Sequence, residues 1–214
     1  APRPASLRTS LLGTFAAPSD RVVALLCVTG FAAMGTFVGV YNAVSFRLQS
    51  PPFLLGAAAS LVYLAYPVGI AAPALARALA DRIGRGGATA GFVGLLAAAV
   101  ALISLPTLSA VVAGLGLITF AFLGTHSLLS GWVVDRARRV GRGTAQAAGA
   151  YLGTYYLGST LAGAVATWQW QAGGWTGVAV LGLGLAAVAL LTALAASGAD
   201  RNPHGAAEAV AAAL

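Results

Sequence analysis

Charge is scarce in this chain. Only 8% of its 214 residues are charged, whereas a soluble domain carries about 25%. Lysine is absent, so all 12 basic residues are arginines, and they face only 5 acidic residues. So little charge cannot cover the surface of a water-soluble domain. Because 59% of the residues are hydrophobic, the composition predicts an integral membrane protein.

Cysteine is almost missing as well. The single cysteine, Cys27, excludes an internal disulfide. The net charge of +7 would suggest a nucleic-acid partner in a soluble protein. Here the arginines lie between apolar stretches, so membrane topology explains them better, and we expect no nucleic-acid partner.

Six long charge-free stretches are present. Each can cross a hydrocarbon core of about 30 Å, which takes roughly 17–25 residues. Backbone groups in lipid must pair within a helix or a closed barrel, and the alternation of barrel strands is absent. The sequence therefore predicts an all-α membrane protein with six transmembrane helices, at 22–45, 53–76, 88–105, 108–134, 145–170 and 176–196.

Prolines mark the second predicted helix. Ser50, followed by Pro51 and Pro52, predicts an N-cap and a first turn. Pro67 and Pro73 each remove a backbone hydrogen bond, so both are expected to kink this helix.

The arginines predict the orientation. Loops at 77–87 and 135–144 carry most of them, and both tails add more on the same side of an even number of spans. Of the 12 arginines, Arg47 alone falls on the other side. The positive-inside rule then places both termini in the cytoplasm. We expect three parts: a cytoplasmic tail or surface helix at 1–20, the helix bundle at 21–196, and a cytoplasmic tail at 197–214.

The segment 124–159 holds the strongest functional candidates. His126 is the one side chain in a span, besides Cys27 and the tyrosines, that can ionise. An ionisable residue inside the membrane indicates a functional site, although a bond to a neighbouring carbonyl is an equal alternative. Ser130 lies one turn away on the same face, where it is expected to orient His126.

Tyrosines extend this polar surface. Tyr155 is expected at the same depth as His126, and Ser159 continues its stripe one turn later. Tyr151 and Tyr156 are interpreted as structural residues. The predicted substrate-cavity residues are Asn42, Tyr63, Tyr66, His126, Ser130, Tyr155 and Ser159.

Residues 79–85, LADRIGR, resemble the loop signature G-x-L-A-D-R-x-G-R-R of the major facilitator superfamily. The resemblance implies a gating loop formed by Asp81, Arg82, Gly84 and Arg85, in which Asp81 latches onto a neighbouring helix end. A carboxylate is stabilised at a helix N-terminus. The leading glycine of the signature is Arg77 here, which weakens the close packing that glycine permits.

Further stretches resemble the YnfM-like branch of bacterial inner-membrane efflux transporters within that superfamily. They lie at 41–53, 130–133, 151–159 and 173–175. The resemblance implies helices seven to twelve of a twelve-helix protein. It also implies that the first, second, fourth and fifth of these helices line a cavity, while the third and sixth face lipid.

This resemblance implies one half of a secondary transporter that exports small organic molecules or drugs by alternating access. The expected partners are membrane lipid, the N-terminal six-helix half, a small-molecule substrate, and protons in antiport. Because the six spans contain no Asp or Glu, either the other half or His126 would titrate. The alternative is a half-size carrier that works as a homodimer with a second copy.

An intramembrane serine protease of rhomboid type also has six helices, and Ser130-Gly131 resembles its G-x-S-G motif. Here Leu128 replaces the first glycine, and the second histidine, His204, lies outside the sixth span. Apart from His126, the histidine that activates such a serine is missing. We therefore expect a transporter and no enzyme, with no catalytic residue, no metal and no cofactor.

Overall fold

The structure is a computed structural model that describes residues 20–201. Expectations for residues 1–19 and 202–214 lie outside the described residues. Across residues 20–201 every element is helical, which confirms the all-α class. In chain order the elements are α2 (Arg21–Gln49), the 3-10 helix η2 (Gly56–Ala71), α3 (Ala72–Ile103), α4 (Leu108–Arg139) and α5 (Thr144–Arg201).

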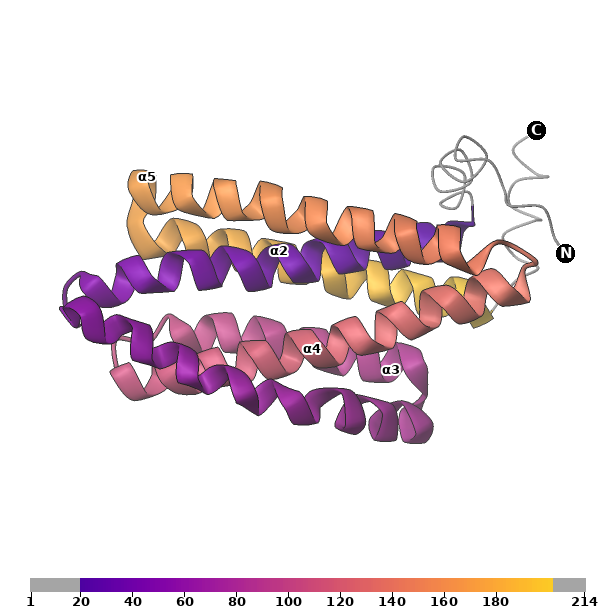
Figure 1. Cartoon of the computed structure of the whole chain (residues 1–214), viewed down its shortest axis with the longest axis horizontal. Coiled ribbons are helices and arrows are strands. Elements are labelled where there is room, and N and C mark those ends of the chain that lie inside the picture. The colour runs from indigo at the N-terminus through magenta and orange to yellow at the C-terminus, as the bar shows by residue number, and fades with distance from the viewer. Residues whose placement is uncertain (1–19, 202–214) are drawn as a thin grey trace, which may run out of the picture.

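Two of these helices are broken by a glycine. Gly84 in α3 has φ 79° and ψ 158°, and Gly174 in α5 has φ 61° and ψ −150°. Glycine adopts such angles without the steric cost that a side chain would bring. At each break the chain turns back, so that α5 runs along the bundle and returns beside itself (Figure 1). The described part contains four helical stretches long and apolar enough to cross a membrane: Arg21–Gln49, Gly56–Ile103, Leu108–Arg139 and Thr144–Arg201.

Ser50 closes α2 instead of opening the next helix, so the N-cap prediction is wrong. Its amide donates to the carbonyl of Arg47, and its hydroxyl donates to the carbonyl of Phe46 at 2.9 Å. Both donors of Ser50 are thus used by the last turn of α2. The next helical element starts only at Gly56.

The predicted α-helix at 53–76 is a 3-10 helix over Gly56–Ala71. Pro67 lies inside it, and the proline ring disfavours α geometry because it clashes with the carbonyl four residues earlier. Pro73 does not kink a helix but lies in the first turn of α3, where a missing amide costs nothing. A 3-10 helix rises about 2.0 Å per residue, so this element is about 32 Å long.

Helix α4 continues to Arg139, past its predicted end at residue 134. Arg136, Arg138 and Arg139 therefore lie in its last turn, and the predicted arginine loop at 135–144 shrinks to residues 140–143. Positive charge is favourable at a helix C-terminus. Helix α5 likewise extends past residue 196 to Arg201, so the predicted C-terminal tail begins as helix.

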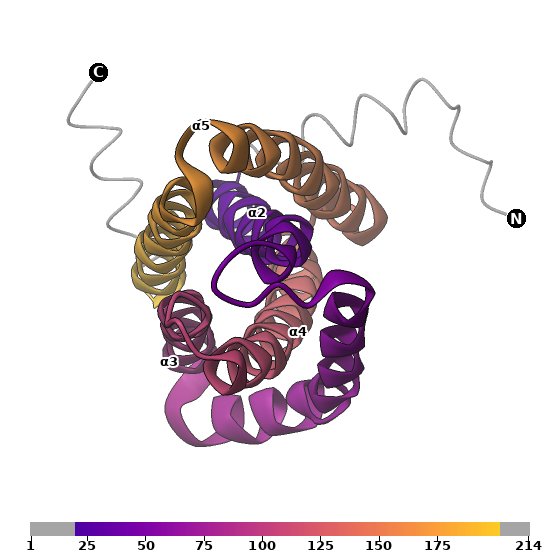
Figure 2. The same cartoon turned by 90° about the vertical axis from the view of Figure 1, so that its left-hand side faces the viewer.

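Helices α2 and α5 pack through glycine. A Cβ atom on Gly158 would lie 2.2 Å from the carbonyl oxygen of Phe31, and one on Gly35 would lie 2.9 Å from the Cβ of Ala162. The two backbones approach this closely only because neither glycine has a side chain, as is common between helices in lipid. Viewed along the bundle, α2 lies between α5 and α4 (Figure 2).

Candidate functional site

His126 of α4 and Tyr151 of α5 form a hydrogen-bonded pair. The Nδ1 atom of His126 lies 2.9 Å from the Tyr151 hydroxyl, and the tautomer of the histidine decides which group donates. Tyr151 is only 1% exposed. Its ring rests on Gly30 of α2, where a Cβ atom would lie 2.5 Å from the ring. Three helices thus hold the histidine in one orientation.

Tyr155 lies beside this pair, as its predicted depth implies. Its ring centroid is 4.8 Å from that of His126 and 6.0 Å from that of Phe122. Phe122 in turn stacks on Phe37 of α2 at 4.3 Å. The histidine is therefore flanked by rings from α4 and α5, and Phe122 connects them to α2.

A second group of rings joins the first through Phe37. Tyr41 lies 4.6 Å from Phe37 and 5.6 Å from Tyr63 of η2, whose hydroxyl donates to the Tyr41 carbonyl at 3.2 Å. Tyr66 lies within 6.5 Å of both Phe37 and Tyr41. We call this continuous set the aromatic band: Phe37, Tyr41, Tyr63, Tyr66, Phe122, His126, Tyr151, Tyr155 and Tyr156.

The side chains of three predicted residues make no hydrogen bond to the aromatic band within the described residues. The Ser130 hydroxyl donates to the carbonyl of Ser127 at 3.2 Å, so the expectation that Ser130 orients His126 is wrong. Asn42 is exposed on α2, near Gly163 of α5, and Ser159 is half-buried. Within residues 20–201, no hydrogen bond joins either side chain to Tyr63, Tyr66, His126 or Tyr155.

Sequence reasoning missed the role of Tyr151. A hydroxyl inside an apolar helix needs a hydrogen-bond partner, and Tyr151 lies four residues before Tyr155, on the same face. These two signals together would have placed it next to His126.

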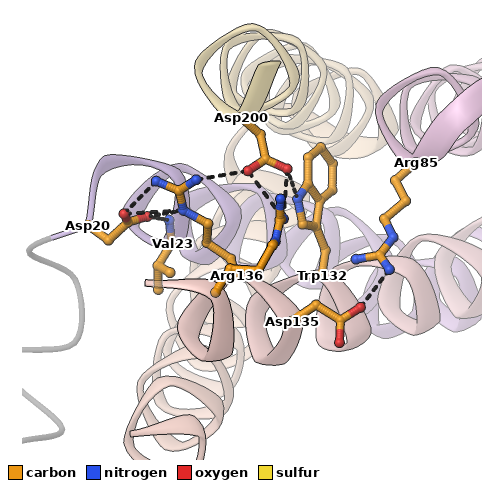
Figure 3. A network of polar contacts seen from close by, with 8 residues as sticks. Asp20, Val23, Arg85, Trp132, Asp135, Arg136 and Asp200 are labelled. Atoms are coloured by element: carbon orange, nitrogen blue, oxygen red, sulfur yellow. Dashed lines mark hydrogen bonds and ion pairs between the residues drawn. The ribbon is translucent and has the colours of Figure 1, made fainter. Parts of the chain in front are cut away.

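A charged cluster closes the arginine-bearing end of the bundle (Figure 3). Arg136 of α4 bridges Asp20, at 2.9 Å, and Asp200, at 3.0 Å. The side chains of Arg136, Asp20 and Asp200 are 15%, 11% and 15% exposed. The Trp132 indole donates to Asp200 at 2.9 Å, and Arg139 forms an ion pair with the same carboxylate at 3.0 Å. The cluster ties the start of α2 to the ends of α4 and α5.

Asp20 is also the N-cap of α2, because its carboxylate accepts from the Val23 amide at 3.0 Å. Burial by itself would raise the pKa of this carboxyl. The hydrogen bonds from Arg136 and from the Val23 amide outweigh burial, so the pKa of Asp20 lies below its ordinary value.

The gating-loop residues surround the break in α3. Gly84 supplies the turn, and Arg85 pairs with Asp135 of α4 at 2.5 Å. Asp81 and Arg82 are exposed. The ion pair that links this loop to another helix is therefore made by Arg85.

Arg47 seals the opposite end. Its guanidinium donates to the carbonyls of Ile103, Ser104 and Leu105, the latter two at 2.9 and 3.1 Å. It lies 4.4 Å over the ring of Trp175, whose indole donates to the Ser104 hydroxyl. Arg47 thus caps the C-terminal carbonyls of α3.

Ser130 and His126 do not form the hydrogen-bonded pair of a serine protease. Ser130 donates to the carbonyl of Ser127, and His126 bonds to the hydroxyl of Tyr151. Within residues 20–201, no three His, Cys, Asp or Glu side chains gather where they could hold a metal ion.

No family model and no solved structure matches the chain. Relatives are found among bacterial transporters. The MFS-type transporter YybF of Bacillus subtilis is 33% identical over 84% of this chain and 43% of its own length. The inner membrane transport protein YnfM of Escherichia coli is 33% identical over 80% of this chain and 41% of its own length. A transporter of Buchnera aphidicola is 28% identical over 83% of this chain and 43% of its own length.

The chain spans less than half the length of each of these relatives. The matched region nevertheless covers most of this chain. It confirms the resemblance to the major facilitator superfamily that the sequence motifs indicate. Over at least 80% of its length, the chain is therefore a relative of MFS-type membrane transporters, YnfM among them.

Proposed function

We propose that the chain forms helices seven to twelve of a twelve-helix secondary transporter. The breaks at Gly84 and Gly174 divide α3 and α5, which supports six crossings when η2 and the first segment of α3 are taken as one. The share of each relative that the chain spans, 41–43% for the two at 33% identity, supports a half-transporter. The arginines favour both termini in the cytoplasm, and the inner-membrane relative YnfM supports a bacterial inner membrane.

The partner that we propose is the N-terminal six-helix half of the same transporter. Two halves of this kind enclose the substrate near the midplane of the membrane. Exposed aromatic and aliphatic side chains on η2 and α5 support this proposal, among them Tyr66, Tyr156 and Leu157. A second copy of the chain would serve the same purpose in a half-size homodimeric carrier.

The aromatic band carries the proposal. It joins η2, α2, α4 and the first part of α5, the segments that the family resemblance assigns to the cavity wall. Aromatic faces bind flat organic molecules and cations through stacking. Export of small organic molecules by alternating access fits such a wall, and the His126–Tyr151 pair is the group suited to exchange protons in antiport.

Transport by the complete protein in proteoliposomes tests this function, with a panel of aromatic organic compounds as substrates. Tyr155→Leu removes the ring at the centre of the aromatic band and is expected to lower uptake about 10-fold, since a lost ring contact corresponds to roughly 1.4 kcal/mol. Phe120→Leu is the matched control, because Phe120 contacts Phe92 away from the aromatic band. Equal losses in both variants would refute the proposed wall.

A further inference from the structure

A cavity of about 510 Å³ opens at the arginine-bearing end, separate from the aromatic band. It lies between the turn at Gly84, the end of α4 and the end of α5. Its charged lining consists of Arg85, Arg138, Arg139, Arg201, Asp135 and Asp200.

This lining has an excess of positive charge. Four arginines face two aspartates, which leaves two positive charges uncompensated. Asp135 is shared by Arg85, at 2.5 Å, and Arg138, at 3.7 Å. Asp200 already binds both Arg139 and the more deeply buried Arg136 (Figure 3). A hollow with an excess of one sign of charge attracts ions of the opposite sign.

The backbone adds to this field. The second segment of α3 begins just after Gly84, so its first amides, which have no partner within the helix, lie at this end of the bundle. A helix N-terminus favours anions. The side chain of Arg138 is 72% exposed, and Arg201 is exposed as well, so both can close on a ligand without breaking the buried bonds of Arg136.

The same cavity adjoins an apolar helix surface. Leu194 precedes Ser197 and Arg201 of the cavity by three and seven residues, so all three share one face of α5. Leu194 is exposed, as is Leu191 one turn earlier. An acyl chain fits along these leucines while its phosphate lies among the arginines. A free phosphate ion would gain nothing from the apolar strip.

We propose that this cavity binds the phosphate headgroup of an anionic phospholipid. Basic pockets between membrane helices on the cytoplasmic side bind such headgroups. The proposal requires only that the helices span a bilayer, and it does not depend on the substrate or the coupling of transport. The headgroup would bridge α3, α4 and α5 through Arg85, Arg138 and Arg201.

Lipid retention by the complete protein tests the site. The protein is placed in phosphatidylcholine nanodiscs with graded amounts of phosphatidylglycerol, and retained lipid is measured by native mass spectrometry. The wild type is expected to retain phosphatidylglycerol selectively. The pair Arg138→Gln and Arg201→Gln is expected to bind it about 30-fold more weakly, from two lost surface charges.

The matched control pair is Arg21→Gln and Arg82→Gln, which removes the same charge from exposed positions of the same end, outside the cavity. It is expected to retain the lipid almost as the wild type does. The pair Arg138→Lys and Arg201→Lys keeps the charge and is expected to keep the selectivity.

Three results would overturn the assignment: equal losses in the cavity and control pairs, equal retention of both lipids by the wild type, or loss of selectivity in the lysine pair. Full displacement of the lipid by inorganic phosphate would also overturn it, because that outcome assigns the cavity to a soluble anion.

Discussion

The bond between His126 and Tyr151 joins two groups that sequence reasoning treated differently. The histidine was a functional candidate with a structural role as an equal alternative, and the tyrosine was interpreted as structural, yet they lie 2.9 Å apart. Tyr151 is almost fully buried against Gly30, so it cannot turn away from the histidine. Because the tyrosine is fixed, its hydrogen bond holds the half-buried imidazole of His126 in one direction.

Removing one hydroxyl tests what this hydrogen bond contributes to stability. Tyr151→Phe keeps the ring but deletes the bond to His126, and it is expected to lower the stability of the folded protein by about 1 kcal/mol. Tyr156→Phe is the control, because Tyr156 is 61% exposed. Thermal unfolding in detergent measures both variants. Equal melting temperatures for Tyr151→Phe and the wild type would show that the bond does not stabilise the fold.

His126 is expected to set the pH dependence of transport. Histidine changes charge between about pH 5 and 8, and within residues 20–201 the spans hold no other imidazole. Transport by the complete protein is measured across this range for the wild type, His126→Gln and His126→Ala. Both variants are expected to give a flatter profile. If rate and profile stay as in the wild type, His126 serves packing alone.

At the scale of whole elements, the contact between α2 and α5 is set by small residues. Gly158→Ala would place a methyl group 2.2 Å from the carbonyl oxygen of Phe31, which forces the two backbones apart. Overpacking of this kind costs about 1–3 kcal/mol. A lower melting temperature is therefore expected. Gly153→Ala, on the same helix, meets no atom within 4 Å and is expected to leave the melting temperature unchanged or raise it.

The sequence predicts where the helices lie better than where they end or which type they are. Hydropathy reports how well a stretch dissolves in lipid, and this located all of the described helices. It does not report backbone geometry, so the 3-10 form of η2 could not be foreseen. The extra turn of α4 and the helical end of α5 are held by ion pairs such as Arg136–Asp200, which join residues far apart in sequence.

The candidate site, too, could be predicted only in part from the sequence. Periodicity and depth placed His126 beside Tyr155, because both lie on adjoining helices at countable distances from one end. Periodicity within a helix cannot tell which neighbouring helix a side chain meets. The link from Phe122 to Phe37, which makes one aromatic band of two groups, arises from the packing of α2 on α4.

At the scale of the whole molecule, the Asp20–Arg136–Asp200 cluster holds three helices together at one end. The pKa of Asp20 is lowered in the folded state, so its contribution to stability is fully present above the ordinary pKa of about 3.9 and is lost as the pH falls through the lower folded value. Thermal stability is therefore expected to fall below about pH 4. The loss should be smaller in Asp20→Asn, and an equal acid dependence in both proteins would contradict this account.

The proposed half-transporter also makes a prediction for the entire chain. Residues 1–214 alone are expected to insert into liposomes without catalysing transport, because half of the cavity wall would be absent. Flux is measured together with the oligomeric state. Saturable flux from a monomeric chain would refute the half-transporter, while flux from a dimer would favour the half-size carrier.

Because Arg47 is buried, the two ends of the bundle differ in exposed positive charge by more than a count of the arginines implies. The guanidinium is buried and its donors are occupied by the carbonyls of Ile103, Ser104 and Leu105. Among the arginines of residues 20–201, all the exposed ones therefore lie at the opposite end. One end of the bundle therefore carries all the exposed arginines of the described residues, some of them paired with Asp135 and Asp200, while the other end presents almost no positive charge, so a charged solute meets a different electric field at each end.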